Sequence, residues 1–125
     1  MSRTPLVCAN WKMNQTASEA ETWALAFASA IEPHRSDLAG ACEIAVAPAH
    51  PVLDRLGRAL DGSGIHLAAQ NVHADESGAF TGEVSVAMLE DLGCRVTFDT
   101  YAGMAHSACP EEFDAISSFL KSSLL

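Results

Sequence analysis

The side chains that could carry chemistry in this 125-residue sequence are mainly histidines and cysteines, and their spacing excludes the commonest kinds of site. They are His34, His50, His66, His73, His106, Cys8, Cys42, Cys94 and Cys109. No H-x-x-x-H or C-x-x-C pair occurs, so the sequence predicts no metal site and no cofactor. Widely spaced cysteines are typical of buried or free thiols in a reducing compartment rather than of a disulfide framework.

A long irregular loop is expected at residues 69–83, between an apolar run and a helix-like segment. Connections usually have about four to six residues, so a loop of this length is typical of a functional or interaction element. Gly78 and Gly82 bracket its tip, and Phe80 lies between them. A plain solvated loop is the alternative, but a large apolar side chain at a loop tip favours packing against another surface.

The elements before residue 94 alternate between strand and helix patterns, which predicts parallel βα units with right-handed crossovers. Strands are predicted at residues 6–9, 44–47 and 65–69. The first is a continuous apolar run, typical of a strand that is buried on both faces of a parallel sheet.

Helix ends are also marked in the sequence. A capping box formed by Thr16 and Glu19 predicts the start of the first helix, and Pro33 predicts its end. Pro51 suits the first turn of the second helix, and Ser85 the N-cap of a short third helix that Gly93 ends. The predicted inward faces are Ala20, Trp23, Ala24, Phe27 and Ile31 in the first helix, Val52, Leu53, Leu56 and Leu60 in the second, and Met88, Leu89 and Leu92 in the third.

The last 30 or so residues have a different pattern. Residues 95–101 alternate between apolar and polar side chains, which predicts a half-exposed strand. A turn-rich loop around Gly103 and His106 follows, and Pro110 begins a final helix with an apolar face of Phe113, Ile116, Leu120 and Leu124.

Two motifs resemble the triosephosphate isomerase family over about residues 5–96. Ala9-Asn10-Trp11-Lys12-Met13-Asn14 resembles the first βα loop of that family. Ala69-Gln70-Asn71-Val72, continued by Gly78-Ala79-Phe80-Thr81-Gly82-Glu83, resembles its third βα loop. The resemblance implies an α/β fold of parallel βα units, forming a partial or half TIM barrel.

The resemblance also implies roles for particular residues. Asn10 and Lys12 would bind the substrate, with the Lys12 ammonium facing an anionic, phosphate-bearing triose and its enediolate charge. Gln70 would support the first loop from behind, and the interface with a neighbouring subunit would include Met13, Phe80, Thr81 and Glu83. Without the resemblance, Lys12 is an ordinary surface lysine and Gln70 caps the end of a strand.

Residues 97–125 resemble a second family. The stretch from Val96 to Ser107, with Gly103-Met104-Ala105-His106-Ser107, is similar to the end of an acyl-protein thioesterase or carboxylesterase of the α/β-hydrolase fold. There His106 would be the triad base, but no G-x-S-x-G nucleophile elbow occurs in the sequence, so His106 is an orphan.

Two alternatives therefore exist for the end of the chain. The first is a composite of two domains, residues 1–96 and 97–125. The second is a diverged continuation of the isomerase, whose family also carries a His-Ser pair after its fourth strand. The long interval from Gly93 to His106 disfavours the second alternative.

The composition limits partners and compartment. A net charge of −9 disfavours binding to nucleic acid and to anionic membranes, which both require basic surface. No apolar run approaches the ~18 residues of a membrane-spanning helix, and no signal-peptide core stands at the N-terminus, so the expected location is the cytosol.

The expected function follows from the resemblance. The family uses a glutamate base and phosphate-binding loops that have no counterpart in these 125 residues. We therefore expect a chain that retains the Asn-x-Lys loop but is inactive alone, and that binds a phosphorylated triose weakly. The alternatives are an isomerase assembled from several chains and a non-catalytic oligomerisation module. Self-association of the chain is expected whichever of these functions it has.

Overall fold

The computed structural model describes residues 4–94 and residue 118, and the chain divides into two compact units, 1–94 and 95–125. The account below concerns the first unit. Its elements in chain order are β1 (Leu6–Asn10), α1 (Ala17–Ile31), η1 (Glu32–His34), α2 (Arg35–Leu38), β2 (Glu43–Ala47), η2 (His50–Val52), α3 (Leu53–Leu60), β3 (His66–Leu67) and α4 (Val86–Asp91). The predicted alternation of strands and helices is confirmed over this part of the chain.

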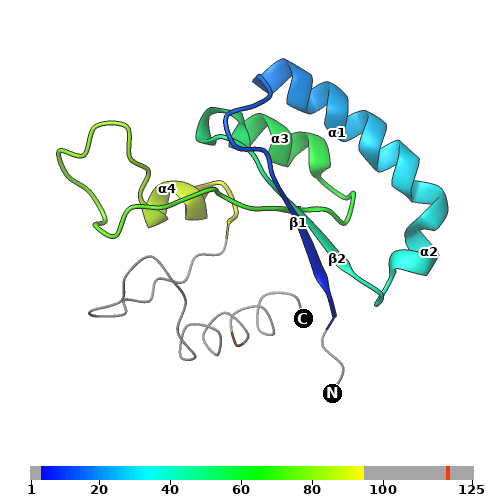
Figure 1. Ribbon diagram of the computed structural model, residues 1–125. Coiled ribbons are helices and arrows are strands. Elements are labelled where there is room, and N and C mark those ends of the chain that lie inside the picture. Colours follow the sequence, from blue (N-terminus) through cyan, green and yellow to red (C-terminus); the bar gives the residue numbers. More distant parts are fainter. Residues whose placement is uncertain (1–3, 95–117, 119–125) are drawn as a thin grey trace. The chain divides into compact units, whose positions relative to one another are not determined.

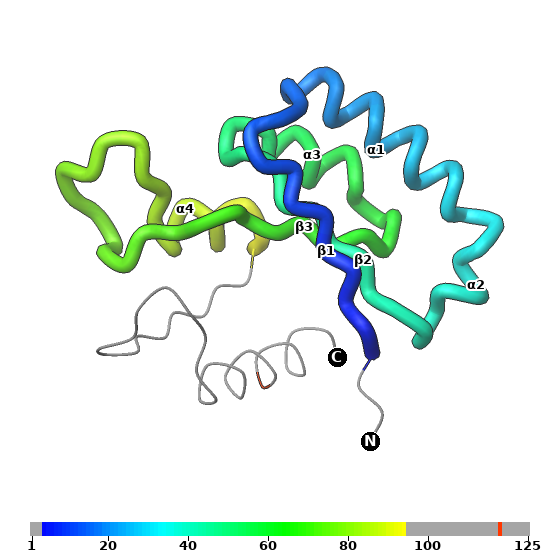
Figure 2. The backbone as a smooth tube through the Cα atoms, in the orientation of Figure 1, coloured from blue at the N-terminus to red at the C-terminus, as the bar shows by residue number. Residues whose placement is uncertain are grey.

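The three described strands form one parallel sheet in the order β1-β2-β3, which confirms the predicted parallel topology. Figure 2 labels all three strands, which overlap in this view. Val7 lies opposite Ile44, and Val46 lies opposite Leu67. Because paired residues in a sheet share a face, these four side chains point to one side. Leu6, Cys8 and Asn10 therefore point to the other side. Because the strands are parallel, their carboxyl ends lie at the same end of the sheet.

The hydrophobic core lies on the side of the sheet that α1 and α3 cover (Figure 1). Its buried members are Ala20, Ala24, Val46, Val52, Leu56, Leu60 and Ile65. The helix faces predicted for α1 and α3 supply most of this cluster, so those two predictions are confirmed. Arg55 of α3 also pairs with Glu21 and donates to the Ser18 hydroxyl of α1, although a half-exposed pair of this kind contributes only about 0.2–1 kcal/mol.

The first helix begins at the predicted capping box. The Glu19 N–H donates to the Thr16 hydroxyl, and the Thr16 N–H donates to the Glu19 carboxylate at 2.8 Å. The backbone N–H of Thr16, and then its hydroxyl, lower the pKa of Glu19. α1 ends at Ile31, and Pro33 lies in the 3-10 turn η1 that follows.

Two predictions about the sheet are wrong in detail. β1 is exposed along its whole length, and Val7 is 57% exposed, because β1 is an edge strand whose outer side no described element covers. β3 has only two residues instead of the five predicted at 65–69. The backbone leaves the sheet after Ala68, whose N–H donates to the Val46 carbonyl.

The inward face predicted for α4 is only partly correct. Ser85 caps the helix through its bond from the Met88 N–H, and Leu89 is 2% exposed. Met88 is 59% exposed and Leu92 is 37% exposed, so the prediction that both point inward is wrong. Met88 lies about 100° around the helix axis from Leu89, and Leu92 is the C-cap residue beyond the last helical residue, Asp91.

The loop expected at residues 69–83 is irregular in the structure and extends away from α1 and α3 (Figure 1). The His73 N–H donates to the Val84 carbonyl at 2.8 Å, which closes the segment 73–84 at its base. Phe80 lies against His73, with 4.1 Å between the ring centroids, and is 42% exposed. The predicted packing of Phe80 is therefore satisfied partly within the loop itself.

The elements predicted after residue 94 lie outside the described residues. They are the half-exposed strand at 95–101, the loop that carries His106, and the final helix that begins near Pro110. Cys109 also lies there. These predictions stay predictions.

We predict that Leu56→Ala will lower the free energy of unfolding by about 2–5 kcal/mol, because it empties a fully buried position of the core. Leu25→Ala, at a position that is 64% exposed on α1, should change it by no more than about 0.5 kcal/mol. Urea unfolding followed by circular dichroism measures both values. Equal losses for the two variants would contradict the position of the core.

We predict that Gly78→Ala will displace Phe80 from His73. A Cβ at Gly78 would stand 2.6 Å from the Phe80 ring, whereas a Cβ at Gly82 would meet nothing within 4 Å. Both glycines have positive φ, so Gly82→Ala is a matched control for backbone strain alone. The NMR shifts of the His73 ring protons should change in Gly78→Ala and stay near wild type in Gly82→Ala.

Candidate functional site

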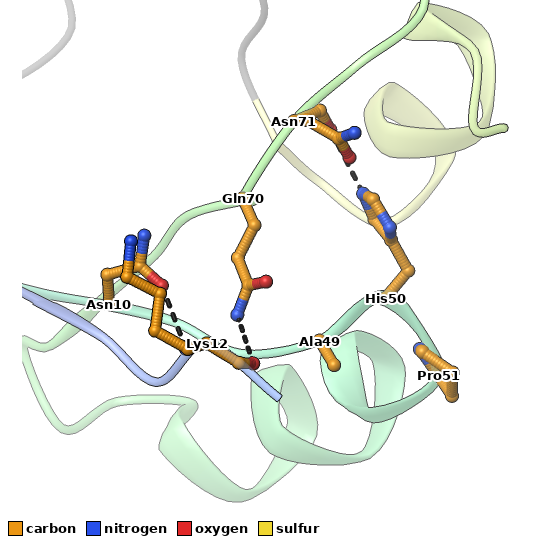
Figure 3. A pocket seen from close by; sticks show the side chains of 7 residues that line it. All are labelled: Asn10, Lys12, Ala49, His50, Pro51, Gln70 and Asn71. Carbon is orange, nitrogen blue, oxygen red and sulfur yellow. Dashed lines mark hydrogen bonds between the residues drawn. The ribbon is translucent and has the colours of Figure 1, made fainter. Parts of the chain in front are cut away.

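A cavity of about 410 Å³ lies at the carboxyl end of the parallel sheet. Three loops line it, one after each strand, as expected for ligand sites of parallel α/β folds. The lining residues are Asn10, Lys12, Ala49, His50, Pro51, Gln70 and Asn71 (Figure 3). The structure therefore brings together Asn10, Lys12 and Gln70, which the sequence predicted as site residues.

The loop after β1 is fixed by hydrogen bonds of its own. The Lys12 N–H donates to Asn10 Oδ1 at 2.9 Å, and Asn14 Nδ2 donates to the Trp11 carbonyl at 2.7 Å. The Trp11 N–H donates to the Ala47 carbonyl at 3.0 Å, which joins the loop to the end of β2. The Trp11 ring meets Trp23 of α1 edge to face, with 4.9 Å between the centroids. The loop is thus attached both to the sheet and to the core.

Lys12 has a left-handed backbone, with φ of +56°. A non-glycine residue in this region costs of order 1–3 kcal/mol and occurs mainly where surrounding contacts impose it. Those contacts are present here. Asn10 Oδ1 accepts from the Lys12 N–H, and Gln70 Nε2 donates to the Lys12 carbonyl at 2.8 Å.

Gln70 connects the three loops. Figure 3 shows the Gln70 amide beside the Lys12 backbone. The same Nε2 also donates to the Ala47 carbonyl at 3.0 Å, so one amide group joins the loop after β3 to the end of β2 and to the Lys12 peptide. This amide reaches across 58 residues of sequence. Gln70 was expected to support the first loop, and in the structure its amide contacts the backbone of that loop at Lys12.

The electrostatics of the cavity differ from those of the whole chain. No carboxylate is among the lining residues, and Lys12 carries a full positive charge there. The net charge of the chain is −9. In Figure 3 the nitrogen ends of Asn10 and Lys12 point in the same direction. Such an ammonium and amide pair is suited to binding an anion.

His50 is the second titratable residue, with Lys12, in the described lining of the cavity, and the sequence did not single it out as a site residue. Its Nε2 lies 3.0 Å from the Asn71 carbonyl oxygen. A signal was available, because His50 follows the second predicted strand by three residues. Residues that directly follow parallel strands lie together at the carboxyl end of the sheet.

The predicted interface residues lie apart from the cavity. Met13 is 94% exposed. Phe80, Thr81 and Glu83 belong to the separate loop at 73–84 and do not line the cavity. His106 lies outside the described residues, so the structure does not place it.

Within the described part of the chain, no group of three or more histidine, cysteine, aspartate or glutamate side chains could hold a metal ion. Burial raises the pKa of the Cys94 thiol, so that thiol stays protonated near neutral pH. The helices described here include none that is long and apolar enough to cross a membrane.

Comparison with known proteins agrees with the two sequence motifs. Triosephosphate isomerase of Chlorobium luteolum is 46% identical over 105 residues, which are 84% of this chain and 38% of that protein. The enzyme of Chlorobium phaeobacteroides is 48% identical over 92 residues, 74% of this chain and 35% of that protein. The enzyme of Clostridium acetobutylicum is 40% identical over 112 residues, 90% of this chain and 41% of that protein.

The chain thus spans about two fifths of the length of the curated relatives it matches. The family model for triosephosphate isomerase matches residues 5–99. That range includes all three strands, the cavity and the loop at 73–84. The parallel sheet with its helices is accordingly part of an α/β barrel, and the chain belongs to the triosephosphate isomerase family.

Proposed function

We propose that this chain carries the part of a triosephosphate isomerase site that binds the substrate anion, and that it does not turn over substrate alone. Asn10 and Lys12 are the binding residues, and Gln70 keeps them in place. The observation that supports this assignment is the Gln70 amide bond to the Lys12 carbonyl, which stabilises the left-handed conformation of Lys12 beside the cavity.

The ligand class follows from the charges at the cavity. A phosphate or enediolate oxygen near the Lys12 ammonium gains a charge-assisted hydrogen bond, and the Asn10 amide adds a neutral donor. The lining residues offer no carboxylate to repel such a ligand. A single full positive charge gives weak binding, so we propose a phosphorylated triose as a weakly bound ligand.

The chain is proposed to be inactive alone because isomerisation requires a base and phosphate-binding loops in addition to the anion site. Isomerisation of a triose phosphate removes a proton next to a carbonyl group, and the family uses a glutamate base with a neutral histidine for this step. The family also binds the phosphate with loops that follow its last two strands. The 125 residues contain no counterpart of the glutamate motif.

The segment after Val96 bears on this proposal. An alignment that covers 112 residues of this chain necessarily continues past Val96. This favours the second alternative, a diverged continuation of the isomerase, rather than a foreign tail that begins near Val96. His106 then corresponds to the histidine of the family's His-Ser pair. The resemblance of residues 97–125 to the end of an α/β-hydrolase remains a hypothesis based on the Gly-Met-Ala-His-Ser stretch.

Self-association is the second part of the proposal. β1 is one of the two edge strands of the described sheet and is exposed, and an edge strand offers unpaired N–H and C=O groups to another chain. The loop at 73–84 presents Thr81 and part of Phe80 to solvent. Such association could serve assembly of an active barrel or an oligomerisation module without catalysis, and measured turnover distinguishes the two.

We predict that inorganic phosphate will shift the amide NMR signals of Asn10 and Lys12, and that Lys12→Ala will abolish the shifts. A coupled assay of the same chain should show no isomerase turnover above the Lys12→Ala background. The matched control is Arg58→Ala, which removes an exposed cation outside the cavity. Loss of the phosphate shifts in Arg58→Ala would indicate nonspecific charge effects.

If the chain shows turnover that is lost in Lys12→Ala, the proposed inactivity is wrong, but the proposed anion site stands. Phosphate shifts that persist in Lys12→Ala would refute the anion site. The two halves of the proposal can therefore fail separately.

We predict that the chain will form a dimer or larger oligomer in moderate salt, as measured by light scattering. Val7→Lys places a charge on the β1 edge and should reduce the mass if the edge is the interface. Thr81→Asp should reduce it if the loop is the interface, and Leu25→Glu, at another exposed apolar position, should have no effect. A monomer at high concentration in the unaltered protein would refute association.

A further inference from the structure

The segment that carries Gln70 has few attachments to the rest of the sheet. The Ala68 N–H donates to the Val46 carbonyl before it, and the His73 N–H donates to the Val84 carbonyl after it. Among the described residues, the hydrogen bonds of the segment 69–72 are those of the Gln70 side chain and the bond between His50 and the Asn71 carbonyl. The backbone next to Gln70 therefore depends on His50.

The partner of His50 determines which ring nitrogen carries a proton. A backbone carbonyl oxygen can only accept a hydrogen bond, so His50 Nε2, at 3.0 Å from the Asn71 oxygen, must be the donor. The neutral Nε2–H form and the imidazolium both satisfy this requirement. The bond thus survives protonation of the ring at Nδ1. Among the described residues that line the cavity with His50, Lys12 is the charged one.

We propose that His50 is a positioning residue for the anion site and acts through Asn71 and Gln70 on Lys12. The steps are adjacent in the structure. His50 fixes the Asn71 carbonyl, the Asn71 backbone continues into Gln70, and the Gln70 amide fixes the Lys12 carbonyl. Without the imidazole N–H, the peptide after Gln70 can rotate, and the amide no longer stays within reach of both the Lys12 and the Ala47 carbonyls.

This inference deepens the proposed function, but its test needs no substrate, so it can fail while the anion site stands. The test uses the whole 125-residue chain labelled with ¹⁵N. Its reporter is the Lys12 amide, which is bonded to Asn10 Oδ1. Gln70→Ala defines the signal of a Lys12 peptide that has lost its support.

We expect His50→Ala to move the Lys12 amide signal in the same direction as Gln70→Ala, and to speed exchange of that amide by about fivefold, the effect of one lost hydrogen bond. His50→Gln, which retains a side-chain N–H donor, should restore much of the wild-type signal. His34→Ala, at a histidine of η1 that does not line the cavity, should leave Lys12 unchanged.

The inference is overturned if Lys12 in His50→Ala matches wild type while Gln70→Ala differs, or if His50→Gln gives no more rescue than His50→Phe. The unaltered protein supplies a test that requires no variant to fold. Its ring ¹⁵N shifts should show the Nε2–H tautomer of the neutral His50 ring. An Nδ1–H form would overturn the proposal.

Discussion

One side-chain amide, that of Gln70, donates to two carbonyl groups at the end of the sheet, that of Lys12 after β1 and that of Ala47 in β2, which also accepts from the Trp11 N–H. The ends of parallel strands leave backbone groups beyond the last ladder bond, and a buried or half-buried carbonyl without a donor is costly. Nε2 of Gln70 supplies a donor to the Lys12 and Ala47 carbonyls at once. The position of Lys12, and its link to the loop after β3, depend on this contact.

The constraint explains why a strained backbone is tolerated beside the site. Lys12 has φ of +56°, yet its N–H and its C=O are both hydrogen-bonded. The N–H donates to Asn10, and the C=O accepts from Gln70. Trp11 adds packing, because its ring lies against Trp23 in the α1 layer. The core formed by α1, α3 and β2 therefore determines where the loop begins, and polar contacts determine where its lysine is placed.

Local sequence patterns predicted much of this unit. The Thr16 and Glu19 capping box, the apolar faces of α1 and α3 and the Ser85 cap act over a few residues, so the sequence displays them directly. Exposure of β1 and of Met88 depends on which neighbours are present, and no window of sequence contains that information. The role expected for Gln70 came from family resemblance, because a contact across 58 residues leaves no periodic signal. His50 was identifiable only from its place after a strand.

The negative charge of the chain and the anion site are compatible because they act at different ranges. Charges on the outer surface that are farther than about 8–10 Å from the cavity are largely screened at ordinary salt. An anion about 4 Å from the Lys12 ammonium experiences an attraction of order 4 kcal/mol at an effective dielectric constant near 20. The nearest fixed charge therefore decides the sign of the local potential, and the lining residues contain no carboxylate to oppose it. Affinity is limited instead by the number of donors, since Lys12 and Asn10 can engage only one side of a phosphate group. Asn71, which also lines the cavity, can add only another neutral amide, so one full charge among the described lining residues both selects for anions and keeps the site weak.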